Sequence, residues 1–489
     1  MSAIPYNPFD RTLVGQPRAL ATLFMTEMWE RFSYYGMRAL LVLFMITPVS
    51  DGGMGFSAAK AAGIYAIYVA LVYLTPLPGG WIGDRLLGAR RTVFLGGAII
   101  AGGHVVLAIF GGAGLFPALA LIIIGTGLLK PNMTAMVGSI YDYKPELRDA
   151  GFSIYYMGIN LGAFLAPLVC GYLGQQVSWE LGFGAAAVGM LIALIQYAIG
   201  IRGLGPIGAK PENPLLRDEQ RRYGIGAAIG VVVAVLLVVL DLMVIHLSSE
   251  GIELLITIVI VAIPIAWFGR TLRDERGNAQ NRNKVLVLLA LFVAAAVFWL
   301  VYDQAGSTVA IFAQEDTSNV VFGWSFPSSW FQSVNPLLII ALAPVMAIIW
   351  TALGARGKQP GTPYKFFGGL FLVAVSMLVM VFAAHAAIDG KVAAMWLIAV
   401  FAIQTVGELM LSPVGMAAAT RLSPPDRVSQ TLGVWFLATS VGDAIGGRIA
   451  TYYDQLGQQA FFGLLGAIAL VAALVVLALA RPLSRLVPD

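Results

Sequence analysis

The chain has 489 residues, of which 59% are apolar and only 11% are charged, and its formal net charge at pH 7 is +4. A soluble domain carries about 25% charged residues, so the composition excludes an ordinary soluble protein and indicates an all-α protein that crosses a membrane many times. The single cysteine, Cys170, excludes a disulfide framework and a thiolate metal cluster.

Stretches of about 20 mainly apolar residues, the length of one membrane-spanning helix, predict fourteen spans. The first six are expected near 22–48, 57–83, 91–110, 115–138, 151–173 and 180–201. Two more are expected near 224–247 and 251–270, and the last six near 285–313, 331–353, 364–386, 393–420, 428–450 and 458–481. Residues 1–20 show no apolar core followed by a small-residue cleavage site, so we expect the first span to be retained.

The Lys and Arg residues predict the orientation, because positive charges collect in the cytoplasmic loops of membrane proteins. With a cytoplasmic N-terminus, 24 of the 30 basic residues fall in cytoplasmic segments, four lie within spans, and only Lys60 and Lys391 lie outside. Both termini are therefore expected in the cytoplasm. The same distribution explains the basic balance of the chain, so we expect the lipid bilayer as its environment and no nucleic-acid partner.

Two blocks of six spans share a layout. The fifth span of each block carries a GxxxG pattern, at 158–162 and 442–446, and the fourth carries an ionisable residue before a proline, Lys130 and Glu408. Their occurrence at equivalent spans supports two related bundles about an axis along the membrane normal. The predicted division is a cytoplasmic N-terminus (1–21), a six-helix bundle (22–201), a linker with two inserted helices (202–284), a second six-helix bundle (285–481) and a cytoplasmic C-terminus (482–489).

One stripe of charge dominates the first span. Glu27, Glu30, Arg31, Tyr34 and Arg38 follow the i, i+3, i+4, i+7, i+11 spacing of one helix face. An ionisable group at mid-bilayer costs about 2.5–3.5 kcal/mol, so this stripe must face protein or water. It either lines a cavity, which we favour, or only pairs internally to hold helices together.

A second set of polar residues lies within later spans. Lys130 lies about eight residues from the cytoplasmic end of its span, so it needs a carboxylate or an anionic ligand unless it snorkels to the interface. Asn160 offers an amide in the fifth span, and Tyr68 in the second either lines a cavity or packs. Asp443 and Arg448 are expected to pair near the cytoplasmic end of the thirteenth span, although a spacing of five suits one helix face poorly.

Four motifs carry a resemblance to a known family. They are Glu-x-x-Glu-Arg-Phe-x-Tyr-Tyr-Gly at 27–36, the loop Gly-Asp-Arg-Leu-Leu-Gly-Ala-Arg-Arg at 83–91, Gly-Leu-Leu-Lys-Pro-Asn at 127–132 and the aromatic-Ile-Asn-x-Gly stretch within 152–164. The loop is similar to that of the major facilitator superfamily, and the chain resembles the proton-dependent oligopeptide transporter family within it. The resemblance implies two six-helix bundles plus two inserted helices, fourteen in all.

The function implied by the resemblance is a proton-coupled symporter that imports di- and tripeptides by alternating access. Such a protein lies in the bacterial cytoplasmic (inner) membrane, and we expect it to act as a monomer, driven by the proton gradient without a cofactor. The sequence also shows no P-loop, no Cys/His metal spacing and no nucleophile–histidine–acid set, so neither ATP drive, a metal nor a catalytic site is expected.

A peptide is a zwitterion, so its site needs both signs of charge across a cavity. Arg38 and Lys130 are expected to face the peptide carboxylate, and Glu408 with Asn160 and Asn335 its amino end, as the resemblance also implies. Further residues are expected to shape the side-chain pockets: Tyr34, Tyr35, Tyr68, Trp299, Trp435 and Ser440.

Proton coupling is expected to rest on carboxylates, because the three histidines (His104, His246 and His385) lie off the charged faces. The residues assigned to coupling are Glu27, Glu30, Arg31, Asp303 and Glu408.

Two ion pairs between the bundles are expected to act as gates, Arg38 with Asp303 and Lys130 with Glu408. The first should close the extracellular side when the cavity opens inward. Members of the family often have glutamate at the place of Asp303, so the reach of this shorter side chain stays open.

A spacing of four residues predicts that Trp299, Asp303 and Ser307 share one helix face.

Two other readings remain open. A proton-coupled drug or sugar carrier of the same superfamily would share the fold but would not need Lys130 opposite Glu408. A receptor or channel would not accumulate a solute against its gradient.

Overall fold

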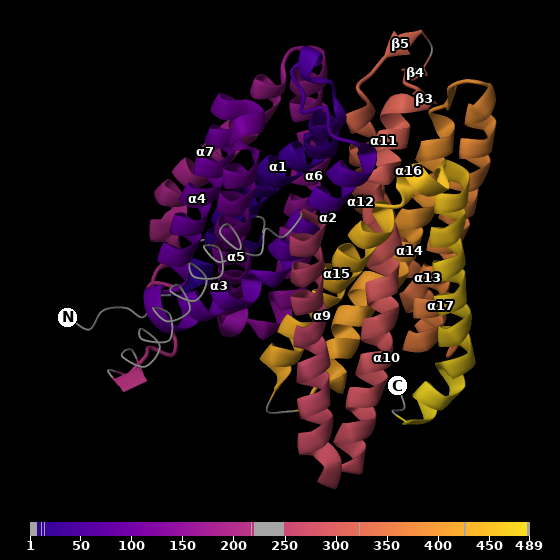
Figure 1. Ribbon diagram of the computed structural model, residues 1–489. Helices are drawn as coiled ribbons and strands as arrows, with labels where there is room; N and C mark the ends of the chain where they lie inside the picture. Colours follow the sequence, from indigo (N-terminus) through magenta and orange to yellow (C-terminus); the bar gives the residue numbers. More distant parts are fainter. Residues whose placement is uncertain are drawn as a thin grey trace.

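The computed structural model describes residues 7–10, 12–13, 15–216, 218–219, 249–321, 323–424 and 427–486; the expected span at 224–247 lies outside them. The chain is almost entirely helical (Figure 1). The helices of the first half are α1 (Arg18–Ile46), α2 (Ala58–Leu74), α3 (Pro76–Ile82), α4 (Ala89–Phe110), α5 (Leu115–Ile140), α6 (Arg148–Gln176) and α7 (Trp179–Gly200).

The remaining helices begin with α9 (Ser249–Asp274), the described member of the inserted pair. The others are α10 (Ala279–Tyr302), α11 (Thr308–Glu315), α12 (Val334–Ala355), α13 (Thr362–Ala386), α14 (Met395–Leu422), α15 (Val428–Ala450), α16 (Tyr453–Leu456) and α17 (Gln458–Leu486). Within the described ranges, ten helical stretches are long and apolar enough to cross a membrane, and one of them covers both α4 and α5. The prediction of an all-α protein with many spans is confirmed.

Three short strand pairs lie in connecting segments. β1 (Thr12–Leu13) pairs antiparallel with β2 (Gln16–Pro17), and β4 (Val320–Val321) with β5 (Trp324–Ser325). β3 (Thr317–Ser318) runs parallel to β6 (Val392–Ala393) and joins the loop after α11 to the loop before α14.

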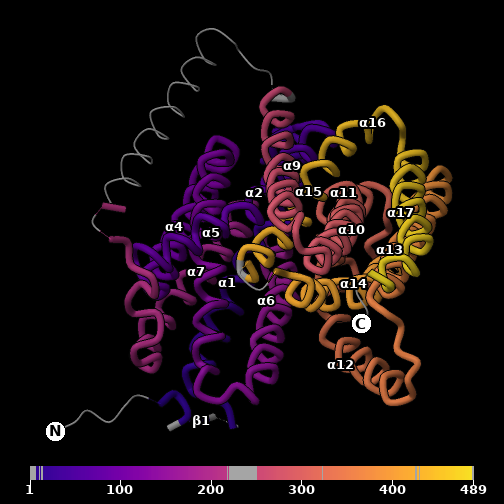
Figure 2. Tube along the Cα trace, turned by 90° about the horizontal axis from the view of Figure 1, so that it is seen from below, coloured from indigo at the N-terminus to yellow at the C-terminus, as the bar shows by residue number. Residues whose placement is uncertain are grey.

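The two halves of the chain form two groups of helices that lie side by side (Figure 2). In the first, α1 packs on α6 and α7, and α4 packs on α5 and α7; in the second, α13 packs on α14 and α17, and α10 on α15 and α17. The groups meet where α2 contacts α15 and where α6 contacts α12. Helix α9 contacts α2 of the first group and α10 and α15 of the second, so it lies along the interface between the two groups.

The two GxxxG patterns have the same role in both halves. Gly158 and Gly162 bring α6 onto α1, and a Cβ atom at Gly162 would lie 2.2 Å from the Met28 carbonyl oxygen. Gly442 likewise brings α15 onto α10. The two halves are therefore similar in this packing, because the first helix of each half lies against the glycine face of its fifth.

Gly162→Ala should lower the midpoint of thermal unfolding, since an added methyl group forces the α1 and α6 backbones apart and overpacking costs about 1–3 kcal/mol. The measurement is the fraction of monodisperse, detergent-solubilised protein after heating. Gly184→Ala on α7 is the control, because nothing lies within 4 Å of a Cβ atom there. Equal midpoints for the two variants would contradict the close α1–α6 contact.

One predicted span is broken near its end. Helix α10 ends at Tyr302, residues Asp303–Gly306 tighten into the 3₁₀ turn η10, and α11 begins at Thr308. The prediction that Ser307 shares a helix face with Asp303 is therefore wrong. Its hydroxyl instead donates to Gln304 Oε1 at 3.1 Å. The span at 57–83 is broken as well, because Pro76 begins a new helix after Thr75.

The predicted pairing of Asp443 with Arg448 is also wrong. Five residues along a helix turn a side chain by about 140°, and Arg448 Nη1 lies 3.8 Å from Glu253 Oε2 of α9. Arg427, at the opposite end of α15, bonds Asp274 at 2.9 Å. Arg448 thus lies at the end of α15 opposite Arg427.

Candidate functional site

A charged cavity of about 250 Å³ lies between the two halves. Its polar and aromatic lining from the first half consists of Glu27, Arg31, Tyr35, Arg38, Tyr73, Lys130, Tyr156 and Asn160. The second half contributes Trp299, Tyr302, Asp303, Gln332, Asn335, Phe401, Glu408, Ser412, Trp435, Phe436 and Thr439. A larger groove of about 670 Å³ between α1, α6 and α7 presents no ionisable side chain, so the charged cavity is the candidate site.

The acidic part of the α1 stripe forms a buried ion-pair cluster. Arg31 Nη2 donates to Glu30 Oε1 at 2.8 Å, and its Nε also bonds the Glu30 carboxylate. The same Nε lies 3.3 Å from Glu27 Oε1, while Glu27 Oε2 accepts a 2.6 Å hydrogen bond from the Tyr155 hydroxyl. Glu27 and Glu30 are 1% and 0% exposed. Two carboxylates therefore share one guanidinium where water has little access.

Lys130 lies on α5 in the same half. Its Nζ lies 4.5 Å from the centre of the Tyr73 ring, within the range of a cation–π interaction. No ion pair within 4.0 Å joins Lys130 to Glu408 in this conformation, so the second predicted gate stays a prediction for another conformation. The ammonium group lines the cavity, as expected.

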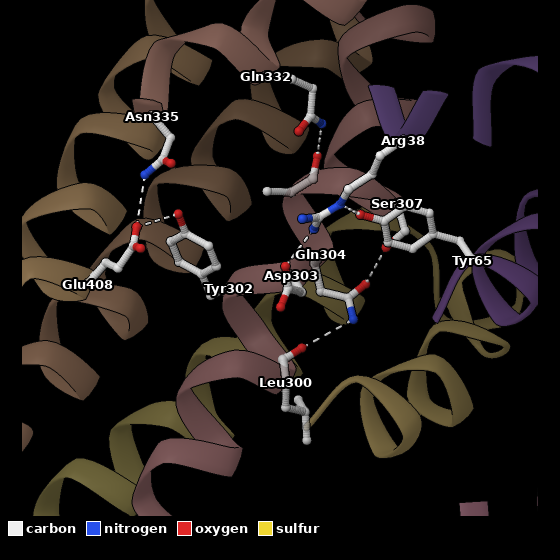
Figure 3. Close-up of polar contacts among 11 residues, drawn as sticks. Arg38, Tyr65, Leu300, Tyr302, Asp303, Gln304, Ser307, Gln332, Asn335 and Glu408 are labelled. Carbon is white, nitrogen blue, oxygen red and sulfur yellow. Dashed lines mark hydrogen bonds and ion pairs between the residues drawn. The ribbon is translucent and has the colours of Figure 1, made fainter. Parts of the chain in front are cut away.

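Glu408 supplies the negative charge of the second half (Figure 3). Its Oε2 accepts hydrogen bonds from the Tyr302 hydroxyl at 2.7 Å and from Asn335 Nδ2 at 3.0 Å. Asn335 Nδ2 also donates to Thr405 Oγ1 at 3.0 Å. These contacts hold the carboxylate at the cavity wall through two neutral donors on Oε2, and no Lys or Arg of the described chain forms an ion pair with it.

The Arg38–Asp303 ion pair joins the two halves (Figure 3). Arg38 Nη2 lies 2.6 Å from Asp303 Oδ1, and its Nε donates to the Tyr65 hydroxyl. A Cβ atom at Gly306 would lie 1.7 Å from that hydroxyl oxygen, so α2 approaches η10 too closely for any side chain there. The ion pair itself is present and the aspartate is long enough to reach Arg38, while its role as a gate stays a prediction.

Three of the residues predicted to bind substrate do not line the cavity. Tyr34 and Tyr68 stack with ring centres 6.4 Å apart, because α2 packs over this part of the α1 stripe. The Arg31 guanidinium lies 5.1 Å from the Tyr34 ring. Ser440 donates to the Ala70 carbonyl oxygen at 2.9 Å, so it joins α15 to α2. The other predicted substrate residues do line the cavity: Tyr35, Arg38, Lys130, Asn160, Trp299, Asn335, Glu408 and Trp435.

Sequence reasoning missed the tyrosines that bind the charged groups. Tyr155 contacts Glu27, Tyr302 contacts Glu408, and Tyr73 lies under Lys130. A tyrosine in a membrane helix more often packs against other helices than binds a charged group, so the presence of a tyrosine does not by itself indicate a site. Tyr302 had one usable signal, since it directly precedes the intramembrane Asp303.

Polar contacts also join the two halves in the segment that precedes α12. Gln175 of α6 donates to Gln314 of α11 at 2.9 Å and to Ser328 at 2.9 Å, and its own amide oxygen accepts from the Ser329 backbone. Ser333 donates to the Phe164 carbonyl oxygen at 2.7 Å. These side chains join the two halves next to the β3–β6 strands.

A many-span membrane protein with a charged cavity at the interface of two related bundles has the arrangement of a secondary transporter. Comparison with known proteins narrows this class. A sequence model of the POT family matches residues 90–469. The di-/tripeptide transporter of Lactococcus lactis subsp. cremoris is 40% identical over 99% of each chain. The chain belongs to the POT family.

Solved structures agree with this assignment. A crystal structure of peptide transporter POT in complex with sulfate superposes with a TM-score of 0.94 at 43% identity, covering 98% of this chain and 97% of the other. A POT family transporter in complex with 5-aminolevulinic acid superposes with a TM-score of 0.93 at 35% identity, covering 98% and 99%. The fold is therefore that of a major facilitator-type peptide transporter.

Proposed function

We propose that the protein is a proton-coupled symporter that imports di- and tripeptides by alternating access. The observation that carries the proposal is the distribution of charge in the cavity. Lys130 and Arg38 come from one bundle, Glu408 from the other, and the amides of Asn160 and Asn335 belong to the same lining. A short zwitterion presents a carboxylate, an amide and an ammonium group, which are the complements of these three kinds of group.

We propose the bacterial cytoplasmic membrane as its location, with both termini in the cytoplasm and a monomer as the working unit. Positive charge supports this orientation, because the connections predicted to be cytoplasmic carry most of the Lys and Arg residues. The hydrogen bond between Gln175 and Gln314 then lies at the outward end, where we infer that it seals the cavity. On this assignment the structure is an inward-facing state, in which the Arg38–Asp303 ion pair holds the outer gate shut.

The direct test is uptake of dialanine and trialanine into proteoliposomes with an imposed inward proton gradient. Accumulation above the level reached without a gradient is expected for both peptides. A receptor or a channel would only equilibrate the solute, so a ratio that never exceeds one would contradict the proposal.

A proton-coupled drug or sugar carrier of the same superfamily is the alternative. A panel of unlabelled competitors against labelled dialanine separates the two functions. Di- and tripeptides should compete, whereas sugars and drugs that lack a carboxylate and an ammonium group should not, because Lys130 and Glu408 would find no partners on them.

The outer seal provides a test of alternating access. Cross-linking cysteines introduced at Gln175 and Gln314 with a short bis-maleimide, in a Cys170→Ala background, should stop uptake by holding the seal closed. Each single-cysteine variant treated in the same way is the control and should keep its uptake. Full uptake by the cross-linked protein would show that this end does not open during transport.

A further inference from the structure

A buried carboxyl group remains outside the proposed peptide site. Asp443 of α15 is 4% exposed, and neither of its carboxylate oxygens has a hydrogen-bond partner among the described residues. It does not line the cavity. A buried charge without a partner is costly in a membrane, so an isolated, ionised Asp443 would destabilise the protein.

Close helix packing directs Asp443 toward the Arg38–Asp303 ion pair. Gly442 and Gly446, on either side of it, hold α15 against α10, where added Cβ atoms would lie 2.5 Å from the Ala296 carbonyl and 2.9 Å from the Leu300 carbonyl oxygen. Helix α15 also contacts η10, which begins with Asp303. Asp443 therefore lies within electrostatic reach of both Asp303 and Arg38.

The charges around this pair do not balance. Arg38 is the only cation of the described chain that interacts with both carboxylates, and it already bonds Asp303 Oδ1. The second oxygen, Asp303 Oδ2, is buried without a hydrogen-bond partner in the described structure. One guanidinium thus faces two carboxyl groups that share three unsatisfied oxygen atoms.

The other charged or titratable groups near α15 are occupied elsewhere. From α9, Glu253 lies 3.8 Å from Arg448. From α2, the Tyr65 hydroxyl bonds Arg38. From α14, Glu408 is held by the Tyr302 hydroxyl and Asn335.

We propose that Asp443 and Asp303 form a two-carboxyl proton site in which they share one proton beside Arg38. A protonated Asp443 donates its O–H to Asp303 Oδ2, while Asp303 Oδ1 keeps the ion pair with Arg38. This arrangement gives partners to two of the three unsatisfied oxygen atoms, one on each carboxyl group, and leaves the trio neutral. Two carboxylates in contact cannot both ionise readily, which is the general basis of proton sharing. The inference rests on the proposed symport and adds Asp443 to its coupling machinery.

The shared proton would be linked to the outer gate. When the proton leaves, two carboxylates face one guanidinium, so Arg38 can no longer neutralise the site by bonding Asp303 alone. When it returns, the Arg38–Asp303 pair is stabilised and the outer end closes. Asp443 acts here through Asp303 and does not touch the peptide.

The transport test uses Asp443→Asn in the full-length protein. Asparagine keeps the shape and can donate to Asp303 Oδ2, so peptide exchange without a proton gradient should stay within about twofold of the wild type. Proton-driven accumulation should fall by about 40-fold at roughly 100 mV, because the contribution of one proton is lost. Asp443→Glu restores a carboxyl group and should recover most of the accumulation. Wild-type accumulation and pH dependence in Asp443→Asn would overturn the proposal, as would loss of exchange together with uptake.

A second measurement does not depend on transport. Infrared difference spectra between acidic and alkaline pH should show the C=O stretching band of a buried protonated carboxyl group in the purified wild type. We expect the band to be absent in Asp443→Asn, shifted in Asp303→Asn and unchanged in the control Asp389→Asn, which alters an exposed residue. A band that persists unchanged in the first two variants would overturn the shared site. Failure of the wild type to accumulate peptide would instead contradict the symport, and the spectra would still decide on the proton site.

Discussion

Lys130→Ala should reduce proton-driven uptake of dialanine by roughly 100-fold to 4,000-fold, with the protein still inserted in the membrane. The variant leaves the peptide carboxylate without its counter-charge and Glu408 without a cation across the cavity. Loss of one member of a buried charge pair costs about 3–5 kcal/mol, and each 1.4 kcal/mol is about tenfold. The measurement is the initial rate of uptake into proteoliposomes, normalised to the amount of reconstituted protein.

A matched control is available at the surface. The Lys60 ammonium also lies over an aromatic ring, 3.8 Å from the centre of Phe56, but its side chain is exposed and remote from the cavity. Lys60→Ala should therefore transport normally. Normal transport by Lys130→Ala as well would reject the assignment of this lysine to the peptide carboxylate.

Glu27→Gln and Glu30→Gln should each lose proton-driven accumulation and keep peptide exchange between the two sides of the membrane. Both carboxylates bond Arg31, so protonating either one changes how firmly the guanidinium is held. One charge that crosses about 100 mV contributes about 2.3 kcal/mol. A tenfold concentration ratio needs about 1.4 kcal/mol, so one proton supports roughly 40-fold accumulation. A glutamine cannot carry that proton, whereas exchange needs no net proton flux.

Tyr155→Phe is the control for this pair of variants. It removes the 2.6 Å hydrogen bond to Glu27 without removing a titratable carboxyl group, so accumulation should persist within a few-fold of the wild type, as expected for loss of one hydrogen bond. Loss of exchange together with uptake in Glu27→Gln or Glu30→Gln, in protein that still binds peptide, would assign these glutamates a structural role.

Much of the site was predictable because charge inside a membrane is costly. The stripe from Glu27 to Arg38 had to face protein or water, and four of its members do line the cavity or pair beside it. The same argument applied to Lys130 and Glu408 at equivalent spans of the two halves. Because a charged side chain that faces lipid destabilises a membrane protein, the sequence alone shows that such a residue must face protein or water.

The rest depended on tertiary packing, which spacing along one helix cannot reveal. Tyr34 shares the stripe of Glu27 but is covered by α2, so only the three-dimensional arrangement removes it from the cavity. The break after Tyr302 left Ser307 off the expected face. The pairing of Arg448 with Glu253 joins two helices that are distant in the sequence.

The 3₁₀ turn at Asp303–Gly306 separates α10 from α11 in what would otherwise be one continuous helix, so it is a candidate hinge. Helix α11 follows the turn, and its eight residues are about 12 Å long. A bend of about 20° at this turn would move Gln314, near the end of α11, by roughly 4 Å. That displacement exceeds the 2.9 Å length of its hydrogen bond to Gln175. Asp303→Asn weakens the ion pair with Arg38 at this turn. It should therefore lower the yield of the bis-maleimide cross-link between cysteines at positions 175 and 314, and an unchanged yield would mean that the turn does not act as a hinge. A change of charge at this turn would then separate Gln314 from Gln175 before either bundle rotates as a whole.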